Sequence, residues 1–282
     1  MKKGLILEGG AMRGMFTCGV LDVFMEEGIT FDVAAGISAG VVFGINYKSR
    51  QIGRGIRYNK KYAMDPRFCS FRSLIKTGDL FGVDFCYREI PEKLDPFDAK
   101  TFTENPMEFY VGATNLEDGK VIFHKCSDGG ETDVLWMRAS ASMPGVSRPV
   151  QVDGYTLLDG GIVDPIPYDY IESLNLDKNV AILTQPADYV KKKTKAMPLY
   201  NWSLRKYPHI AKIMRERHIL YNNMTSEVKE KEKEGKLFVI RPPESLGIER
   251  TERHPEQLER VYQIGRSEAY KRLDELKKYL GE

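Results

Sequence analysis

Two units with the same order of features occupy the first fifty residues: an apolar run, a turn of small residues and a helical pattern. The first unit has its apolar run at 5–7, a glycine-rich turn, and helical spacing of apolar side chains at 15–27. The second has a β-prone run at 31–37, the turn Ser38-Ala39-Gly40, and a buried helix start at 41–47. Strands that alternate with helices form parallel sheets covered by helices. The sequence therefore predicts an α/β fold with a mostly parallel central sheet.

The rest of the chain extends this pattern and then changes in composition. The later segments are a helical cap at 58–97, strands at 108–113 and 120–124 joined by the turn Asp118-Gly119, a helix at 132–143, strands at 150–158 and 180–184, helices at 168–174 and 226–234, a strand at 237–241 and a final helix at 255–280. Between residues 186 and 219 nine Lys or Arg face only two acidic residues. We therefore expect a main domain at 1–190 and a mixed helical extension at 191–282 that docks on it.

The composition excludes several classes of protein. A chain with 42% hydrophobic and 29% charged residues is an ordinary globular protein, and its net charge of +2 gives no reason to expect nucleic-acid binding. No run approaches the roughly 18 apolar residues of a membrane span, and Glu8 interrupts the N-terminal apolar run too early for a secretory signal. The four cysteines lack the spacing of a zinc site. We expect a cytoplasmic protein with reduced thiols, no nucleic-acid partner, no metal and no cofactor.

Residues 36–40 fit the pattern G-x-S-x-G between a predicted strand and a predicted helix. In such a turn the serine hydroxyl points outward, and glycines two residues away on either side remove Cβ atoms that would collide with the turn. The helix that begins after Ser38 also directs its positive N-terminal end toward developing negative charge. The pattern favours Ser38 as a nucleophile, and a simple packing turn is the alternative.

The glycine-rich turn at residues 9–14 is a second candidate feature. Unhindered backbone N–H groups at a helix start can bind a phosphate or the oxyanion of a tetrahedral intermediate. The candidate oxyanion and substrate-binding residues are Gly9, Gly10, Ala11, Met12 and Arg13. The loop is not a P-loop, because no Lys-Ser or Lys-Thr follows it. Arg13 either anchors the loop through backbone carbonyls, which we favour, or faces the anion.

A serine nucleophile needs a base, and the best candidate in the sequence is Asp159. It follows a predicted strand and precedes Gly160-Gly161, at the strand end where α/β sheets build their sites. Partial desolvation would raise the pKa of an aspartate and improve it as a base. The four histidines, at positions 124, 209, 218 and 254, have no obvious orienting carboxylate, so we expect none of them to be the base.

Together the three motifs resemble those of the patatin-like phospholipases, in their bacterial branch, over about residues 4–190. The family's glycine loop corresponds to 9–14, its nucleophile turn to 36–40 and its D-G-[GA] motif to 159–161; residues 139–145 also look like family sequence. The resemblance implies a three-layer α/β/α sandwich and a Ser-Asp dyad that hydrolyses lipid acyl esters without a metal.

By this resemblance Ser38 is the nucleophile, Asp159 the proton acceptor, and the N–H groups around Gly10 to Met12 form the oxyanion hole. One position departs from the family, because Ala11 stands where the family has glycine. If the loop needs a positive φ there, alanine is strained.

Three functions remain open at this stage. The first is a hydrolase whose substrate is a phospholipid or another fatty-acyl ester, with the aromatic residues between Phe68 and Phe85 either lining an acyl pocket or packing in the core. The second is an acyltransferase on the same scaffold. The third is a lipid-surface binding module with a vestigial site. In each of them the basic segment 191–217 either contacts anionic headgroups of a membrane or forms a solvated face.

Overall fold

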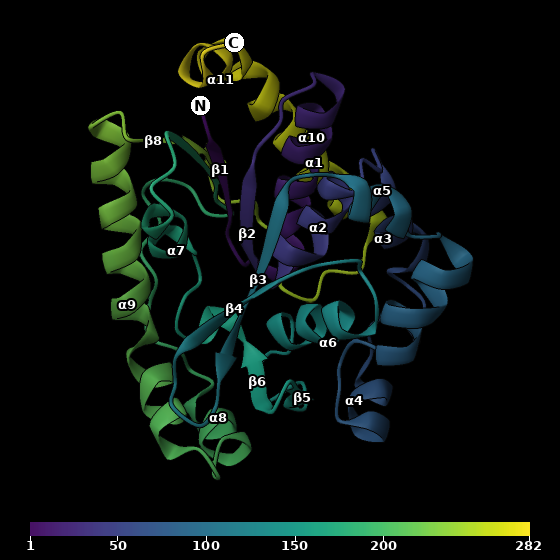
Figure 1. Ribbon diagram of the computed structural model, residues 1–282. Helices are drawn as coiled ribbons and strands as arrows, with labels where there is room; N and C mark the ends of the chain where they lie inside the picture. Colours follow the sequence, from purple (N-terminus) through teal and green to yellow (C-terminus); the bar gives the residue numbers. More distant parts are fainter.

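One eight-stranded sheet forms the centre of the protein, as the computed structural model of residues 1–282 describes it (Figure 1). Its strands are β1 (Lys3–Leu7), β2 (Val33–Ile37), β3 (Glu108–Asn115), β4 (Val121–Lys125), β5 (Val150–Val152), β6 (Tyr155–Asp159), β7 (Lys178–Ile182) and β8 (Leu237–Ile240). The order is β5-β6-β3-β2-β1-β7-β8, with β4 paired to β3. Strands β3, β2, β1, β7 and β8 run parallel to one another. At the β3 end of the sheet, β4 and β6 pair antiparallel with β3, and β5 pairs antiparallel with β6.

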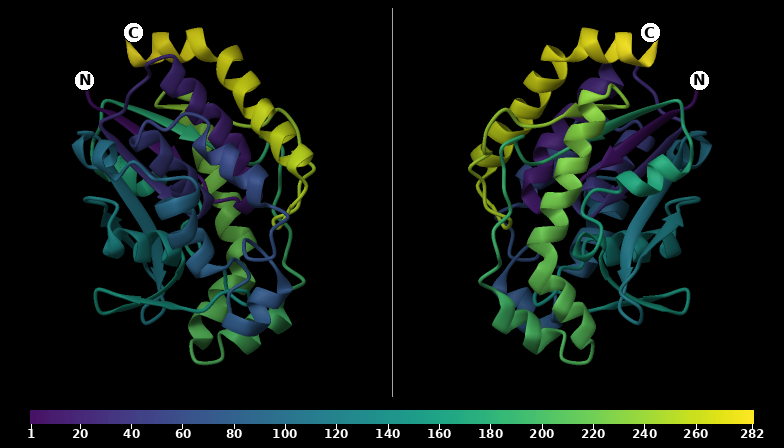
Figure 2. Two further views of the ribbon diagram at one scale, coloured as in Figure 1. Left: turned by 90° about the vertical axis from the view of Figure 1, so that its right-hand side faces the viewer. Right: turned by 90° about the vertical axis from the view of Figure 1, so that its left-hand side faces the viewer.

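Helices cover both faces of the sheet. They are η1 (Ala11–Gly14), α1 (Met15–Glu26), α2 (Ala39–Lys48), α3 (Arg54–Tyr62), α4 (Phe71–Thr77), the π-helical η2 (Phe85–Leu94), α5 (Ala99–Glu104), α6 (Glu131–Ser140), η3 (Gly160–Ile162), α7 (Tyr168–Ser173), α8 (Met197–Ser203), α9 (Pro208–Lys233), α10 (Pro255–Lys271) and α11 (Leu273–Leu280). Helices α1, α2 and α10 lie on one side, and α7 and α9 lie on the other, with α9 running along most of the molecule (Figures 1 and 2).

Alternation along the strands explains the two covered faces. Leu5 and Leu7 of β1 belong to the large core under α1, α2 and α10, whereas Ile6 between them belongs to the core under α7 and α9. Successive side chains of a strand point to opposite faces, so a wholly apolar strand requires a helix layer on each side. The predicted three-layer α/β/α sandwich is confirmed.

Most predicted elements are found close to their expected bounds, and the exceptions lie late in the chain. Residues 150–158 form two strands, because Asp153 and Gly154 have positive φ and turn the chain between β5 and β6. The short helix expected at 226–234 is the end of the 26-residue α9. The single helix expected at 255–280 breaks at Arg272 into α10 and α11. The cap expected at 58–97 contains α3, α4 and η2.

The segment after residue 190 contributes to the same sheet and core. Strand β8 pairs in parallel with β7, and α10 packs directly against α1. The helices approach very closely, since a Cβ atom at Gly19 would lie 2.1 Å from the Tyr262 carbonyl oxygen. The boundary near residue 190 stays a prediction. No helix is both long and apolar enough to span a membrane.

Candidate active site

Ser38 lies at the carboxyl end of β2, in the turn that leads into α2. Its backbone has φ 53° and ψ −118°, a strained conformation for a residue other than glycine. The tight packing around the turn explains this geometry, since a Cβ atom at Gly40 would lie 2.4 Å from the Leu7 carbonyl oxygen. A strand-to-helix turn with a strained serine at its tip is typical of a nucleophile that faces substrate. Ser38 itself is 7% exposed.

Ser140, at the end of α6, holds this turn in position. Its hydroxyl accepts a hydrogen bond from the Ser38 backbone N–H at 2.8 Å and donates one to the Gly112 carbonyl of β3 at 2.6 Å. Both bonds are buried, so the turn is tied to the neighbouring strand through one side chain. The sequence places Ser140 in an expected helix at 132–143 and in a stretch that resembles the family, but nothing in that pattern indicates its contact with Ser38.

Asp159 lies at the end of β6 and faces Ser38. The Gly161 N–H donates to its Oδ1 at 2.7 Å, and the Ser38 side chain lies near the carboxylate in the wall of the same pocket. Burial raises the pKa of Asp159 above its ordinary value, while the polar contacts from Gly161 and Ser38 and the charges of Arg217 and Arg250 oppose the rise. The structure thus brings together the two side chains that the sequence analysis paired, 121 positions apart.

The glycine-rich loop lies against the Ser38 turn. A Cβ atom at Gly9 would lie 3.3 Å from the Ser38 Cβ, and the N–H of Gly9 already donates to the Pro165 carbonyl at 3.1 Å. The amide of Gly10 has no backbone acceptor. Ala11 has φ 50°, which is the positive value that makes alanine strained there.

The sequence analysis favoured Arg13 as an anchor that hydrogen-bonds to backbone carbonyls of the loop, and its Nε atom does not do this. That nitrogen is buried and has no hydrogen-bond partner, so it anchors no backbone carbonyl. The side chain instead lines a pocket next to Ser38.

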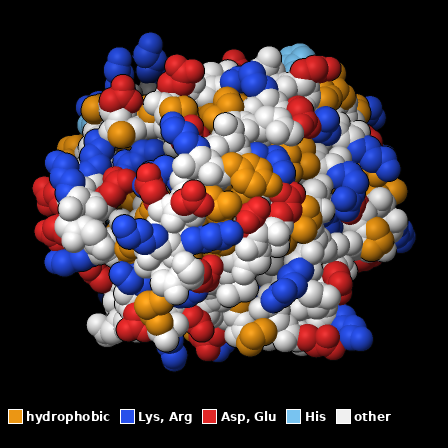
Figure 3. Space-filling model, turned by 90° about the horizontal axis from the view of Figure 1, so that it is seen from above, with side chains coloured by type: hydrophobic (Ala, Val, Ile, Leu, Met, Phe, Trp, Pro, Cys, Tyr) orange, Lys and Arg blue, Asp and Glu red, His pale blue; other side chains and the backbone are white.

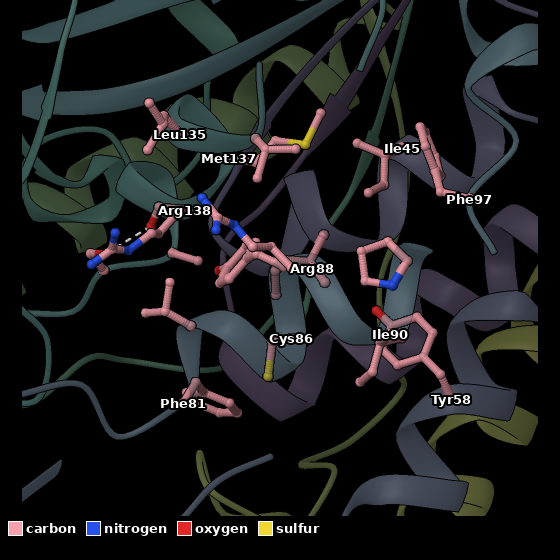
Figure 4. Close-up of a pocket in the computed structure, with 18 of the residues that line it drawn as sticks. Ile45, Tyr58, Phe81, Cys86, Arg88, Ile90, Phe97, Leu135, Met137 and Arg138 are labelled. Carbon is pink, nitrogen blue, oxygen red and sulfur yellow. Dashed lines mark hydrogen bonds between the residues drawn. The ribbon is translucent and has the colours of Figure 1, made fainter. Parts of the chain in front are cut away.

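Two pockets meet at Ser38. The larger has a volume of about 790 Å³, and 20 of its 34 lining residues are hydrophobic. In Figure 4 the side chains of Ile45, Ile90 and Phe97 surround one half of it, and the guanidinium groups of Arg88 and Arg138 lie in the other half. Phe68 and Phe81 also line it, but Phe68 is at the same time buried in a small apolar core with Phe85 and Ile90, so this aromatic stretch both lines the pocket and packs in the core.

The second pocket is smaller and polar, at about 340 Å³. It shares Ala11, Ser38 and Met143 with the first and also contains Asp159. Its charged and titratable lining residues are Glu8, Arg13, Asp159, Lys191, Lys192, Arg217, His218 and Arg250. Sequence reasoning marked the basic segment 191–217 as unusual but gave no sign that it reaches Ser38, and it missed Arg250 entirely.

His218 is the histidine nearest to the candidate site. It lines the polar pocket, and its Nδ1 atom is buried without a hydrogen-bond partner. The other three are engaged elsewhere: His124 contacts Asp133, His209 contacts the Leu116 carbonyl, and His254 contacts Glu252. Asp159 accepts a hydrogen bond from Gly161 and lies beside Ser38, but it has no hydrogen bond to His218.

Two groups of side chains have the spacing of metal ligands: the exposed carboxylates of Asp169, Glu172 and Glu227, and a more buried group around His124. His124, Cys126 and Asp133 offer ligand atoms within 4.8 Å of one another. Asp133 already accepts three backbone N–H bonds on one oxygen and the His124 ring on the other. The cluster therefore reads as a hydrogen-bonded turn. All four cysteines are free thiols.

Two family profiles match the chain. Residues 5–171 match the family described as patatin-like phospholipase, and residues 207–281 match a domain of unknown function, DUF6363. Three similar curated proteins illustrate the range of relatives. The uncharacterized protein YjjU of Escherichia coli is 27% identical over 250 residues, which cover 86% of this chain and 69% of that protein.

The other two are longer than this chain. Lysophospholipase nte1 of Aspergillus niger is 29% identical over 188 residues, which cover 64% of this chain but 12% of that protein. The uncharacterized NTE family protein Mb1092c of Mycobacterium bovis is 27% identical over 178 residues, 63% of this chain and 48% of that protein. Among solved structures, VipD from Legionella pneumophila has a TM-score of 0.47 at 14% identity and covers 97% of this chain and 67% of that chain.

Proposed function

Because this chain belongs to the patatin-like phospholipase family, we propose that it hydrolyses acyl esters of lipids with a Ser38–Asp159 dyad. The observation that carries the proposal is the placement of the Ser38 side chain beside the Asp159 carboxylate, where two pockets meet. Burial that raises the pKa of Asp159 supports its role as a base. The relative named lysophospholipase supports a lipid ester as the class of substrate.

The chemistry follows from these positions. Ser38 Oγ attacks the ester carbonyl carbon while its proton passes to Asp159, and the carbonyl oxygen becomes an oxyanion. N–H groups of the loop around Gly10 to Met12 stabilise that charge. The ester C–O bond then breaks, and the leaving alcohol takes the proton from Asp159. Water then attacks the acyl-enzyme and gives a proton to Asp159, and Ser38 Oγ takes that proton from Asp159 as the fatty acid is released.

The larger, apolar pocket suits the acyl chain. Each CH₂ group that leaves water contributes about 0.8 kcal/mol, so a cavity lined mainly by hydrophobic residues favours long chains. Its border at Ser38 lets an ester carbonyl reach the nucleophile while the chain extends away from the polar pocket.

We also propose that one end of the molecule contacts a lipid surface. Phe71 and Ile75 on α4 are 78% and 87% exposed, and Trp202 on α8 is 65% exposed. Helices α4 and α8 lie at the same end of the molecule in both views (Figures 1 and 2). Helix α8 belongs to the basic segment 191–217, whose positive charges would attract the anionic headgroups of a membrane. Co-sedimentation with anionic vesicles should weaken in an Ile75→Glu variant.

Labelling with a fluorophosphonate, followed by mass-spectrometric mapping of the modified peptide, tests the mechanism. The label should attach to Ser38, and attachment elsewhere would contradict the dyad. An acyltransferase would instead transfer the acyl group to an added alcohol in strong preference to water. A binding module with a vestigial site would associate with vesicles and turn over no ester.

A further inference from the structure

We propose that the polar pocket beside Ser38 binds a phosphate group through Lys191, Arg217 and Arg250. This inference builds on the proposed function, since it assigns a phosphate to the alcohol side of the acyl ester. All three residues lie beyond the part of the chain that matches the phospholipase family, which ends at residue 171. The segment after residue 190 would thereby select the substrate.

Three separate segments bring the cations together. Lys191 lies between β7 and α8, Arg217 lies on α9, and Arg250 lies between β8 and α10. The three charges are close enough to repel one another, because the charges of Arg217 and Arg250 both lower the pKa of the Lys191 ammonium group. A convergence of three segments on one pocket differs from a run of lysines on a single solvated face.

The backbone and side-chain contacts hold two of these residues in place. Asn222 of α9 accepts the Lys191 N–H at 2.8 Å and donates to the Lys191 carbonyl at 3.1 Å. The Lys191 Nζ lies 4.6 Å from the centre of the Tyr221 ring. Arg217 donates from Nε to the Gly161 carbonyl, which leaves its two terminal nitrogens for another acceptor.

None of the three cations has a carboxylate partner. Elsewhere in the protein the buried Arg54 is paired with Asp95, and the partly buried Arg266 is paired with Glu26. The face at the α11 end likewise mixes both signs of charge (Figure 3). A pocket that gathers cations without a salt bridge has an electrostatic surplus that an anion would neutralise.

The two carboxylates in the pocket are already engaged. Glu8 accepts the Tyr221 hydroxyl at 2.7 Å and also the backbone N–H of Thr184. Asp159 accepts the Gly161 N–H and lies beside Ser38. The positive charges of Arg13, Lys191, Lys192, Arg217 and Arg250 therefore exceed the two negative charges by three when all of them are ionised.

Burial and the neighbouring guanidinium groups lower the pKa of Lys191 to about 7. An anion bound between these cations would reverse that effect, because it would stabilise the charged ammonium group. Phosphate fits the donors best, since the planar fork of arginine matches two phosphate oxygens and lysine supplies a point charge. The same chemistry would accept a phosphate on the substrate or free phosphate.

Short acyl esters that stay monomeric in water provide the test. We would compare kcat/KM for hexanoyl-glycerol phosphate with that for hexanoyl-glycerol, which differs only in lacking the phosphate. The parent protein should prefer the phosphate ester by about tenfold or more, as one charge-assisted hydrogen bond can provide. Both Lys191→Gln and Arg250→Gln should reduce the ratio of the two values by about tenfold.

Arg215→Gln is the matched control, because Arg215 lies on α9 two residues before Arg217 and lines neither pocket. It removes one positive charge from the same helix and should leave the ratio unchanged. A general loss of folding would lower both rate constants together and leave their ratio unchanged, so the ratio reports on phosphate recognition itself.

Calorimetry with inorganic phosphate and a Ser38→Ala variant separates the two sources of phosphate and does not require turnover. If inorganic phosphate binds, Arg250→Gln weakens that binding and the two esters react equally well, the result supports the site with free phosphate as its ligand. A preference between the esters that both variants remove supports a phosphate on the substrate. If the parent hydrolyses neither ester, the proposed function fails, and calorimetry alone decides the site. Equal ester rates with no phosphate binding would overturn the inference.

Discussion

The two pockets that meet at Ser38 come from different parts of the chain. Every residue that lines the apolar pocket lies between Ala11 and Ser147, inside the part that matches the phospholipase family. In the polar pocket 12 of the 26 lining residues lie at Tyr189 or beyond. In the proposed function the acyl side of the site is thus built by the shared family domain alone, whereas the alcohol side takes nearly half of its lining residues from the C-terminal segment. Chains that keep the first part and change the second should retain the reaction and change the substrate.

The strongest test of this comparison is at Ser38 and Asp159, the pair proposed to carry the reaction where the two pockets meet. Ser38→Ala and Asp159→Asn should each reduce ester turnover by about 10³-fold or more, since they remove the nucleophile and its base. The measurement is kcat/KM on a neutral hexanoyl ester. Circular dichroism would check that both variants fold.

His218→Ala is the comparison variant for the base. His218 lines the polar pocket but has no hydrogen bond to Asp159, so we expect a loss far smaller than that of Asp159→Asn. The reverse order of the two losses would mean that an imidazole, not Asp159, accepts the proton.

The apolar pocket should determine the preference for acyl-chain length. Ile45→Trp fills part of its apolar half, so we expect kcat/KM for a dodecanoyl ester to fall by about tenfold relative to a butyryl ester. The smaller side chain of Ile45→Ala should preserve the preference for the long chain. An equal loss on both esters in Ile45→Trp would argue that the chain binds elsewhere.

The loop that joins Asp159 to Pro165 beside the polar pocket should make the stability of the protein depend on pH. Burial and the charge of Asp169 raise the pKa of Asp164, in the loop after Asp159, from 3.8 to about 8. The stability due to its protonated form is therefore complete below pH ~4 and is lost as the pH rises toward 8.

Asp164→Asn removes this titration with little change of shape. Its thermal midpoint, measured against the parent, should rise by about 2–4 °C more at pH 8 than at pH 5. An identical change at the two pH values would show that Asp164 ionises in the folded protein as it does in the unfolded chain.

The smallest effect is expected at Ala11, where the two pockets share a wall. Relief of its positive φ should gain about 1–2 kcal/mol, while the greater freedom of glycine in the unfolded chain costs about 0.4–1 kcal/mol. Ala11→Gly should therefore increase the free energy of unfolding by about 0.5–1 kcal/mol in a denaturant titration. Ala39→Gly, in the helical conformation of α2, should decrease it by about 0.5–1 kcal/mol. Changes of the same sign in both variants would contradict the strain at Ala11.

Local patterns were sufficient for the elements that precede the site. The glycine turns after β1 and β2 have strong signals in a few neighbouring residues, so their positions could be predicted to within two or three residues. The bounds of the late helices were harder to predict, since the position of α9 depends on its contacts with β8 and with the core under α7 and α9. Strands β5 and β6 separate at Asp153 and Gly154, where a hairpin turn interrupts an otherwise continuous apolar pattern.

By itself the sequence determined the α/β/α class, the serine turn and the aspartate that follows β6, because each depends on residues close together in the chain. Only the tertiary structure decided which distant side chains meet. Ser140 reaches the backbone of Ser38 across 102 positions, and Lys191, Arg217 and Arg250 converge from three segments. Such contacts depend on how helices pack on the sheet, and spacing along one chain carries no signal for that packing.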